Sequence, residues 1–270
     1  MNKVTLITGA AVASLALLSN SSYADEVAVE KTSSTNTVVE ETAVAASADE
    51  WSFEFTPYIW GARNHGNSGV GQDKNGPGVG HVDIDFGTLM DHLDFGTMGN
   101  FTATKDDILM YSEVTYLVAS DDYRVTGPRG NLSTTVAIDI DGYVVDLGAG
   151  YRLVEQDKFE LYGYGGVRFM EVMVDLGPVS TGDDWVEPQV GLHAKYTMND
   201  TFALQGRVEA GGFGVGSEES YMANLTLNHK INDKWALKYF YRYMKVDYAD
   251  NDFVYDLEIT GPGAGVSYKF

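Results

Sequence analysis

The stretch Phe202-Ala203-Leu204-Gln205-Gly206-Arg207-Val208-Glu209-Ala210 decides the fold. Its even-numbered positions are apolar or glycine, whereas its odd-numbered positions include Gln205, Arg207 and Glu209. Successive side chains of a β-strand point to opposite faces, so a period of two describes a strand with one apolar face and one ionic face. The stretch predicts a strand of a sheet whose two faces meet very different surroundings.

The same alternation recurs along the chain between Trp51 and Phe270. It is clear in residues 159–168, 186–197 and 235–242. Short polar turns separate such segments at 105–107, 155–158, 198–201 and 232–234, and longer connections are expected on the other side at 63–94, 120–132, 176–183, 215–219 and 249–253. Four turns and five loops make nine connections and therefore ten strands.

Short turns at one end and longer loops at the other are typical of outer-membrane barrels. We expect an all-β, antiparallel up-and-down transmembrane β-barrel with short periplasmic turns and longer extracellular loops. Ten strands fit best. Eight or twelve are the alternatives, if 81–86 pairs as a separate strand or 176–184 contains another turn. A soluble barrel is disfavoured because its outward face would have to be polar.

Aromatic residues collect near the short turns, as a membrane-interface girdle would require. This predicted girdle consists of Trp51, Phe53, Tyr151, Phe159, Tyr196, Phe202, Trp235, Tyr268 and Phe270. Three prolines, Pro57, Pro188 and Pro262, fall inside predicted strands, where they cannot donate a ladder hydrogen bond. We expect bulges or ragged pairing at these prolines.

The N-terminal 50 residues differ from the rest. Lys3, the apolar run Val4–Leu18 and the small-x-small end Ser22-Tyr23-Ala24 predict a signal peptide over 1–24. Residues 25–50 carry seven acids and one base, with no aromatic residue, glycine or proline, and predict an acidic disordered tether. The barrel is expected to occupy 51–270.

The composition excludes several functions. The chain has no cysteine, so it has neither a thiol nucleophile nor a cysteine metal site. It has 18 basic and 39 acidic residues, a net charge of −21, so we expect no nucleic-acid partner.

Several longer motifs point to a known group of proteins. They are Trp51-x-Phe53-x-Phe55-x-Pro57-Tyr58-Ile59-Trp60, Val82–Phe86 with Leu93-Asp94-Phe95, Asp184–Pro188, Gly211–Ser217, Tyr241-Arg242-Tyr243, Phe253–Asp256 and the ending Gly261–Phe270. With these motifs the chain resembles a family of uncharacterised Gram-negative outer-membrane β-barrel proteins, within the porin-like and small outer-membrane protein superfamily.

The resemblance implies a location in the cell outer membrane of a Gram-negative bacterium. It also implies contact with outer-membrane lipid and lipopolysaccharide, and recognition of the terminal strand by the barrel-assembly machinery. It implies no activity, because none is established for that family.

Charged residues of both signs are predicted to point into the barrel. A barrel this narrow is expected to be filled by salt bridges and hydrogen bonds, and a narrow water-filled passage for small hydrophilic or cationic solutes is the alternative. The inward set is Glu54, Glu113, Asp146, Arg152, Glu160, Arg168, Glu187, His193, Lys195, Arg207, Glu209, Lys230, Lys238 and Arg242.

The predicted loop 63–94 combines a glycine-rich run, a strand-like piece at Val82–Phe86 and a segment, Leu89–Leu93, with helical spacing. It is expected to be a constriction, a lid or an ordered surface loop. Acids gather at the loop end, where a solvated face is expected and divalent cations are the alternative. They are Asp83, Asp85, Asp91, Asp94, Asp121, Asp122, Asp183, Asp184, Glu218, Glu219, Asp247, Asp250 and Asp252.

Three histidines lie in the same predicted loop: His65, His81 and His92. A rim enzyme with His92 beside Asp91 or Asp94 is an alternative, but no nucleophile motif accompanies these residues. We therefore expect no enzyme, assign no catalytic, cofactor or metal residues, and expect a structural or surface-interaction barrel with a filled, mixed-charge lumen.

Overall fold

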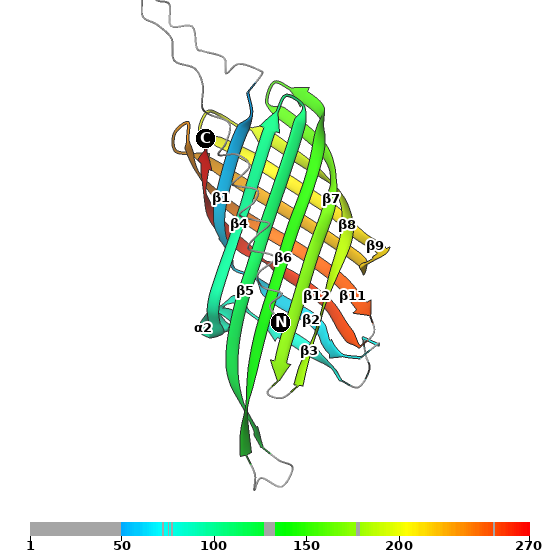
Figure 1. Cartoon of the computed structure of the whole chain (residues 1–270). Coiled ribbons are helices and arrows are strands. Elements are labelled where there is room, and N and C mark those ends of the chain that lie inside the picture. The colour runs from blue at the N-terminus through cyan, green and yellow to red at the C-terminus, as the bar shows by residue number, and fades with distance from the viewer. Residues whose placement is uncertain are drawn as a thin grey trace, which may run out of the picture. The chain divides into compact units, whose positions relative to one another are not determined.

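Ten antiparallel strands close into a barrel in the computed structural model (Figure 1), which describes residues 50–71, 73–74, 76, 78–126, 133–176, 179–250 and 252–270. The strands of the wall are β1 (Ser52–Trp60), β4 (Leu93–Lys105), β5 (Ile108–Thr126), β6 (Ser133–Gln156), β7 (Phe159–Leu176), β8 (Val179–Thr197), β9 (Phe202–Val215), β10 (Ser217–Lys230), β11 (Trp235–Asp250) and β12 (Phe253–Lys269). Each pairs with its neighbour, and β1 with β12 closes the ring. The predicted ten-stranded barrel is confirmed.

The predicted loop 63–94 extends the wall. It contains β2 (Arg63–Val70), β3 (Val79–Ile84) and the short helix α2 (Phe86–His92). Strand β2 pairs with the first half of β12, from Phe253 to Thr260, and β3 pairs with β2. The strand-like and helical pieces expected in this loop are therefore both present. No helix in the described part of the chain has the length and the apolar character needed to span a membrane.

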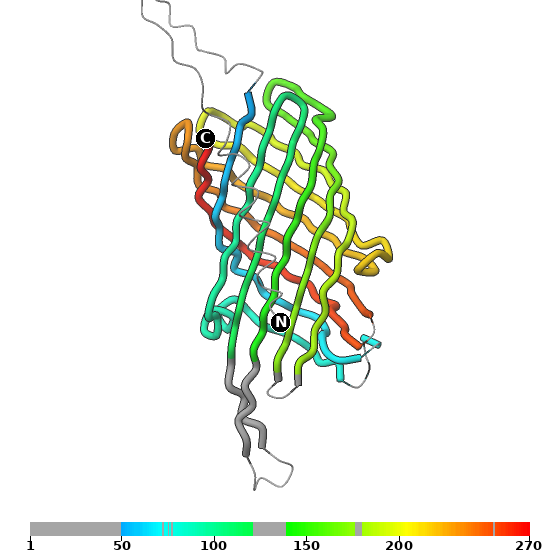
Figure 2. The backbone as a smooth tube through the Cα atoms, viewed as in Figure 1, coloured from blue at the N-terminus to red at the C-terminus, as the bar shows by residue number. Residues whose placement is uncertain are grey.

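All four predicted short turns are found, but the connections at the opposite end differ from prediction. The ladder between β5 and β6 continues to Thr126 and Ser133, where a loop over 120–132 was expected. Likewise Leu176 pairs with Val179, within the loop expected at 176–183. The loops expected at 215–219 and 249–253 are also wrong, because Val215 pairs with Ser217 and Asp250 pairs with Phe253. Strands β5 and β6 project further at this end (Figure 1), and β7 and β8 run beyond β9 and β10 (Figure 2), because strand pairing continues through segments whose acidic composition suggested loops. The predicted signal peptide over 1–24 lies outside the described residues, as does all but the last residue of the predicted tether over 25–50.

The prolines mark places where strand pairing ends. The β1–β4 ladder ends at the pair of Pro57 with Gly99, and the β8–β9 ladder ends at Gln189, next to Pro188. Pro262 lies where β12 changes partner from β1 to β2. Ragged pairing is thus confirmed, whereas the alternative of bulges at the prolines is wrong: the register shifts lie elsewhere, one of them between Ser217 and Glu219. A ladder that stops at the missing N–H needs no extra residue.

The outward face of the barrel is apolar. Ile59, Val190, Val208 and Leu225 expose 66%, 54%, 51% and 55% of their surfaces, while charged neighbours on the same strands face the interior. This inverts the arrangement of a soluble protein and suits a hydrocarbon surrounding. Predicted girdle aromatics contact one another near the short turns, where Phe53 stacks on Phe270 at a centroid distance of 5.8 Å.

Glycines on the lumen face make room for aromatic rings. A Cβ at Gly148 would lie 2.4 Å from Cε1 of Tyr111, whereas a Cβ at Gly206 would meet nothing within 4 Å. We expect Gly148→Ala to lower the free energy of unfolding by about 1–3 kcal/mol, because the ring must move within a packed lumen. Gly206→Ala is the matched control, with an expected change within about 0.5 kcal/mol. Urea unfolding in detergent micelles, followed by tryptophan fluorescence, measures both variants. Equal urea midpoints for the two variants would contradict the close packing of the Tyr111 ring on Gly148.

Candidate functional site

The lumen is the candidate functional site, and it is organised in layers. Alternation places Lys195, His193, Gly191, Gln189, Glu187 and Trp185 at successive inward positions of β8. From the short turns toward the opposite end, this series passes from an open vestibule through buried charges to aromatic side chains. The other strands contribute the same sequence of layers, since strand β11 runs from Lys238 through Arg242 to Met244.

Arg168 is the centre of the buried charges. Its guanidinium donates to three carboxylates: Nε lies 2.7 Å from Oδ1 of Asp146, Nη1 lies 3.2 Å from Oε1 of Glu187, and Nη2 lies 2.7 Å from Oε2 of Glu209. Arg168 is 1% exposed and Glu187 is fully buried. Strand register explains the cluster, because Asp146, Arg168 and Glu187 are direct neighbours across β6, β7 and β8.

Glu113 is a second centre, beside the first. It accepts hydrogen bonds from Arg207 Nη2 at 2.7 Å, Arg242 Nη2 at 2.5 Å and the hydroxyl of Tyr58 at 2.6 Å. Arg207 joins the two centres, since its Nε lies 3.2 Å from Oε1 of Glu209. We call this set the ion-pair layer: Glu113, Asp146, Arg168, Glu187, Gln189, Arg207, Glu209 and Arg242. Four carboxylates against three guanidinium groups give it a formal charge of −1.

Neutral side chains complete the ion-pair layer. The amide of Gln189 donates to the hydroxyl of Tyr111 at 2.9 Å and to Oδ1 of Asp146 at 3.2 Å. The hydroxyl of Ser220 lies 2.5 Å from Oε1 of Glu187, and that of Ser217 donates to its Oε2. Each buried charge is thus held by more than one partner, which is the condition under which buried ions are tolerated.

An apolar layer follows toward the end opposite the short turns. Trp185 stacks on Tyr248 at a centroid distance of 4.0 Å and an interplanar angle of 9°. Buried side chains of β7, β10, β11 and β12 pack around this pair, and Val82 of β3 packs against them. The hairpin β2–β3 therefore covers the apolar core. The apolar layer comprises Trp60, Met170, Trp185, Met222, Met244, Val246, Tyr248, Phe253, Tyr255, Leu257 and Ile259.

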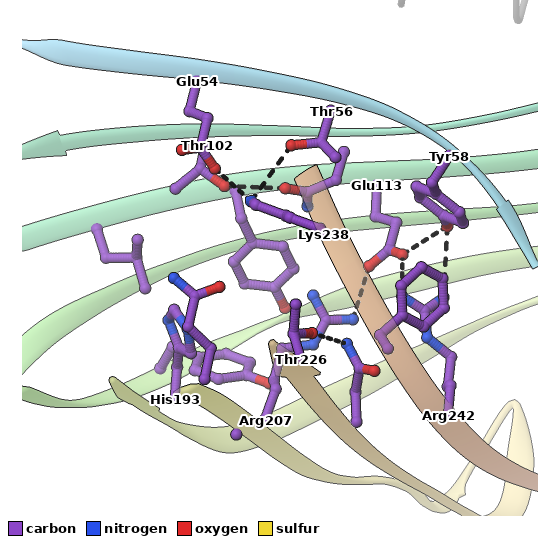
Figure 3. Close-up of a pocket in the computed structure, with 18 residues that line it drawn as sticks. Glu54, Thr56, Tyr58, Thr102, Glu113, His193, Arg207, Thr226, Lys238 and Arg242 are labelled. Carbon is purple, nitrogen blue, oxygen red and sulfur yellow. Dashed lines mark hydrogen bonds and ion pairs between the residues drawn. The ribbon is translucent and has the colours of Figure 1, made fainter. Parts of the chain in front are cut away.

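The other side of the ion-pair layer is hollow. An inner pocket of about 130 Å³ touches Glu113, Arg207 and Arg242 (Figure 3), and an outer cavity of about 490 Å³ reaches turn residues such as Asn199 and Lys234. Both cavities are lined by Glu54, Thr102, Leu109, His193 and Gln205, so they adjoin. We call them together the vestibule. It opens among the short turns.

Most of the predicted inward charges meet in one of these two places. Seven of them form the ion-pair layer, and Glu54, Glu160, His193, Lys195, Lys230 and Lys238 line the vestibule. Arg152 instead pairs with Asp107 in a short turn, at 2.8 Å. The inward set omitted the uncharged partners; alternation alone could have found Gln189, Tyr111 and Tyr164. Ser217 could not be found that way, because the register shift beside it changes its face.

The histidines and acids of the loop end form separate contacts. The rings of His65 and His81 lie edge to face with centroids 4.9 Å apart, and His92 Nδ1 lies 2.8 Å from the carbonyl oxygen of Thr88. Arg63 binds both carboxylate oxygens of Asp83, at 2.8 and 2.7 Å, and this hydrogen bonding lowers the pKa of Asp83. Within the described part of the chain, no group of three or more His, Asp or Glu residues could hold a metal ion.

Comparison with known proteins gives the same fold. Residues 137–256 match the protein family of unknown function DUF481. The outer membrane protease OmpT from Escherichia coli is 11% identical, with a TM-score of 0.51 over 84% of this chain and 99% of that chain. The translocator domain of autotransporter NalP from Neisseria meningitidis is 15% identical, with a TM-score of 0.41 over 82% and 89%. No curated protein matches the sequence.

The OmpT likeness shows the fold and leaves the activity open, because an identity of 11% carries no functional residues across. The resemblance to uncharacterised outer-membrane barrels is confirmed by the closed ten-stranded wall and by the OmpT likeness. The chain thus has the fold of Gram-negative outer-membrane β-barrel proteins, and a large part of that barrel matches a family whose function is unknown.

Proposed function

We propose that this chain is a barrel of the Gram-negative cell outer membrane with a lumen closed to solutes, and that it has a structural or surface-interaction role. The observation that carries the proposal is the pair of layers across the lumen, one ionic and one aromatic. Together they block the lumen on one side of the vestibule with buried side chains. By the usual layout of such barrels, the short turns face the periplasm and β2, β3 and α2 face outward.

Closure of the lumen has a direct electrical test. The purified protein, inserted into a planar bilayer, is expected to give no discrete conductance steps, because water and ions need a continuous polar path. Heat-dependent gel mobility and β-rich circular dichroism must show that the inserted material is folded. Discrete steps from folded protein would overturn closure and support the alternative, a narrow channel for small hydrophilic or cationic solutes.

We further propose that the chain is not an enzyme. The support is that the carboxylate nearest His65, Asp83, is already bound at both oxygens by Arg63, and His65 Nδ1 lies 3.9 Å from it. A base needs an orienting carboxylate that is free to accept from it. Peptide or phospholipid hydrolysis that is lost in His65→Ala, His81→Ala or His92→Ala protein, with the barrel still folded, would contradict this proposal.

We propose outer-membrane lipid and lipopolysaccharide as the surroundings of the apolar outer face, and the barrel-assembly machinery as a partner of β12. Phe270 contacts Phe53, whose backbone N–H and carbonyl both pair with it at the β1–β12 seam. Divalent cations at the acidic loops stay a prediction; Asp83, Glu219 and Asp247 are paired with Arg63, Lys245 and Lys74.

If the barrel-assembly machinery recognises Phe270, replacing this residue should affect assembly in cells more than refolding of the purified protein. Phe270→Ala is expected to lower the amount of barrel in the outer membrane several-fold, because an assembly signal is lost. Refolding in detergent should change little, because Phe270 is 57% exposed and therefore contributes modestly to packing. Quantitative blotting of membranes and refolding yield measure the two effects. Equal losses in both would mean that Phe270 is needed for stability rather than for recognition.

A further inference from the structure

The vestibule is a positively charged part of an acidic barrel. Outside the ion-pair layer, five lysines line it against four carboxylates, a local charge of +1 in a chain of net charge −21. The cationic set is Lys195, Lys230, Lys234, Lys238 and Lys269, and the anionic set is Glu54, Glu160, Asp200 and Asp233. A cleft that reverses the sign of the surrounding protein attracts ligands of the opposite charge.

Within the part of the chain that the structure describes, three of these lysines form ion pairs and two do not. Lys195 lies 2.9 Å from Glu160, Lys230 lies 2.7 Å from Asp233, and Lys238 pairs with Glu54. Among the described residues, Lys234 and Lys269 have no ion pair within 4 Å, although Lys269 is the cross-strand neighbour of Glu54 in the β1–β12 ladder. They are adjacent at the mouth, where the backbone N–H of Lys269 donates to the carbonyl of Lys234 at 2.8 Å. Asp200 is the lining carboxylate that likewise has no ion pair in the described part of the chain.

The vestibule wall also offers amide groups. Gln205 and Asn228 line it without a described hydrogen bond, and Oδ1 of Asn224 is a buried acceptor without a partner among the described residues. Asn and Gln side chains both donate and accept, as a peptide backbone does. The outer cavity, at about 490 Å³, is of the size that holds a small ligand.

We propose that the vestibule is a binding site for a short acidic peptide that enters from the side of the short turns. The peptide carboxylates pair with Lys234 and Lys269, and its backbone amides bond to Gln205, Asn224 and Asn228. The site uses no residue of the ion-pair layer for affinity. The proposal rests on the proposed closed lumen only for the side from which the peptide enters. A binding measurement in detergent micelles tests peptide binding independently of conductance.

The test is calorimetric titration of the full-length protein in detergent micelles with a tetrapeptide that contains two glutamates, compared with its glutamine analogue. The glutamate peptide is expected to bind at least about tenfold more tightly, because exposed lysines contribute a modest energy each and two act together. Its affinity should fall as salt rises. No binding at millimolar concentration, or equal binding of the two peptides, would overturn the proposal.

Variants distinguish binding at this site from a general effect of positive charge at this end of the barrel. Lys234→Gln combined with Lys269→Gln is expected to weaken the glutamate peptide about tenfold. Lys158→Gln, in the short turn between β7 and its predecessor β6 and outside the vestibule lining, is the control at the same end of the barrel and should change nothing. Gln205→Trp should abolish binding by filling the space where the two cavities adjoin, with gel mobility still that of a folded barrel. Equal weakening by Lys158→Gln, or full binding by the Gln205→Trp protein, would contradict the assigned site.

Discussion

Replacing Arg168 by methionine is expected to lower the free energy of unfolding by about 3–5 kcal/mol. The guanidinium contacts Asp146, Glu187 and Glu209, at exposures of 7%, 0% and 1% for the three side chains. Without it, three carboxylates converge in a space from which water is excluded, and Arg207 reaches only one of them directly. The cost is that of uncompensated buried charge rather than of lost packing, because methionine fills much of the same volume.

The urea midpoint of the barrel in detergent micelles measures this effect. Arg152→Met is the matched control: Arg152 also pairs with carboxylates, Asp107 and Glu155, but beside exposed partners at a short turn, so we expect about 1 kcal/mol or less. A third protein combines Arg168→Met with Asp146→Asn, Glu187→Gln and Glu209→Gln. Because it removes the repulsion, it should regain most of the loss. Equal midpoints for the Arg168→Met and Arg152→Met proteins would refute the central role of Arg168.

The alternation of the sequence predicted which residues enter the lumen but not which of them meet. Asp146, Arg168 and Glu187 all follow from a period of two. Their convergence depends on the strand register, which pairs Arg168 with both neighbours. Glu209 joins them from β9, which lies beyond β8 and does not pair with β7. Register is set by turns and by the whole closed ring, so no single segment of sequence carries it.

The apolar layer was missed for a related reason. Trp185, Met170 and Met244 lie two residues from Glu187, Arg168 and Arg242, on the same inward face and nearer the end opposite the short turns. The alternation was described over 159–168, 186–197 and 235–242, and these three residues lie just outside those segments. Their burial follows from the extra length of the strands at that end and from the β2–β3 hairpin that packs Val82 onto the core.

Two layers in series predict how the barrel can be opened. One variant removes the stacked rings, Trp185→Ala with Tyr248→Ala. A second removes one cation and one anion of the ion-pair layer, Arg168→Ala with Glu209→Ala, which lie 2.7 Å apart. Each variant alone is expected to stay silent in a planar bilayer, because the other layer still blocks the path. Only the protein that carries all four substitutions should give discrete conductance steps.

The charged side chains that remain in the opened lumen also predict its ion selectivity. Glu113, Asp146 and Glu187 remain against Arg207 and Arg242, and Asp146 and Glu187 have lost their shared guanidinium. A narrow passage lined in this way should favour cations over anions, which a reversal potential in a salt gradient measures. Gel mobility must show that each variant is folded. If the ring variant alone conducts, the ion-pair layer is not a seal. If the folded fourfold variant stays silent, the closure lies elsewhere in the barrel, and the layered lumen has a purely structural role.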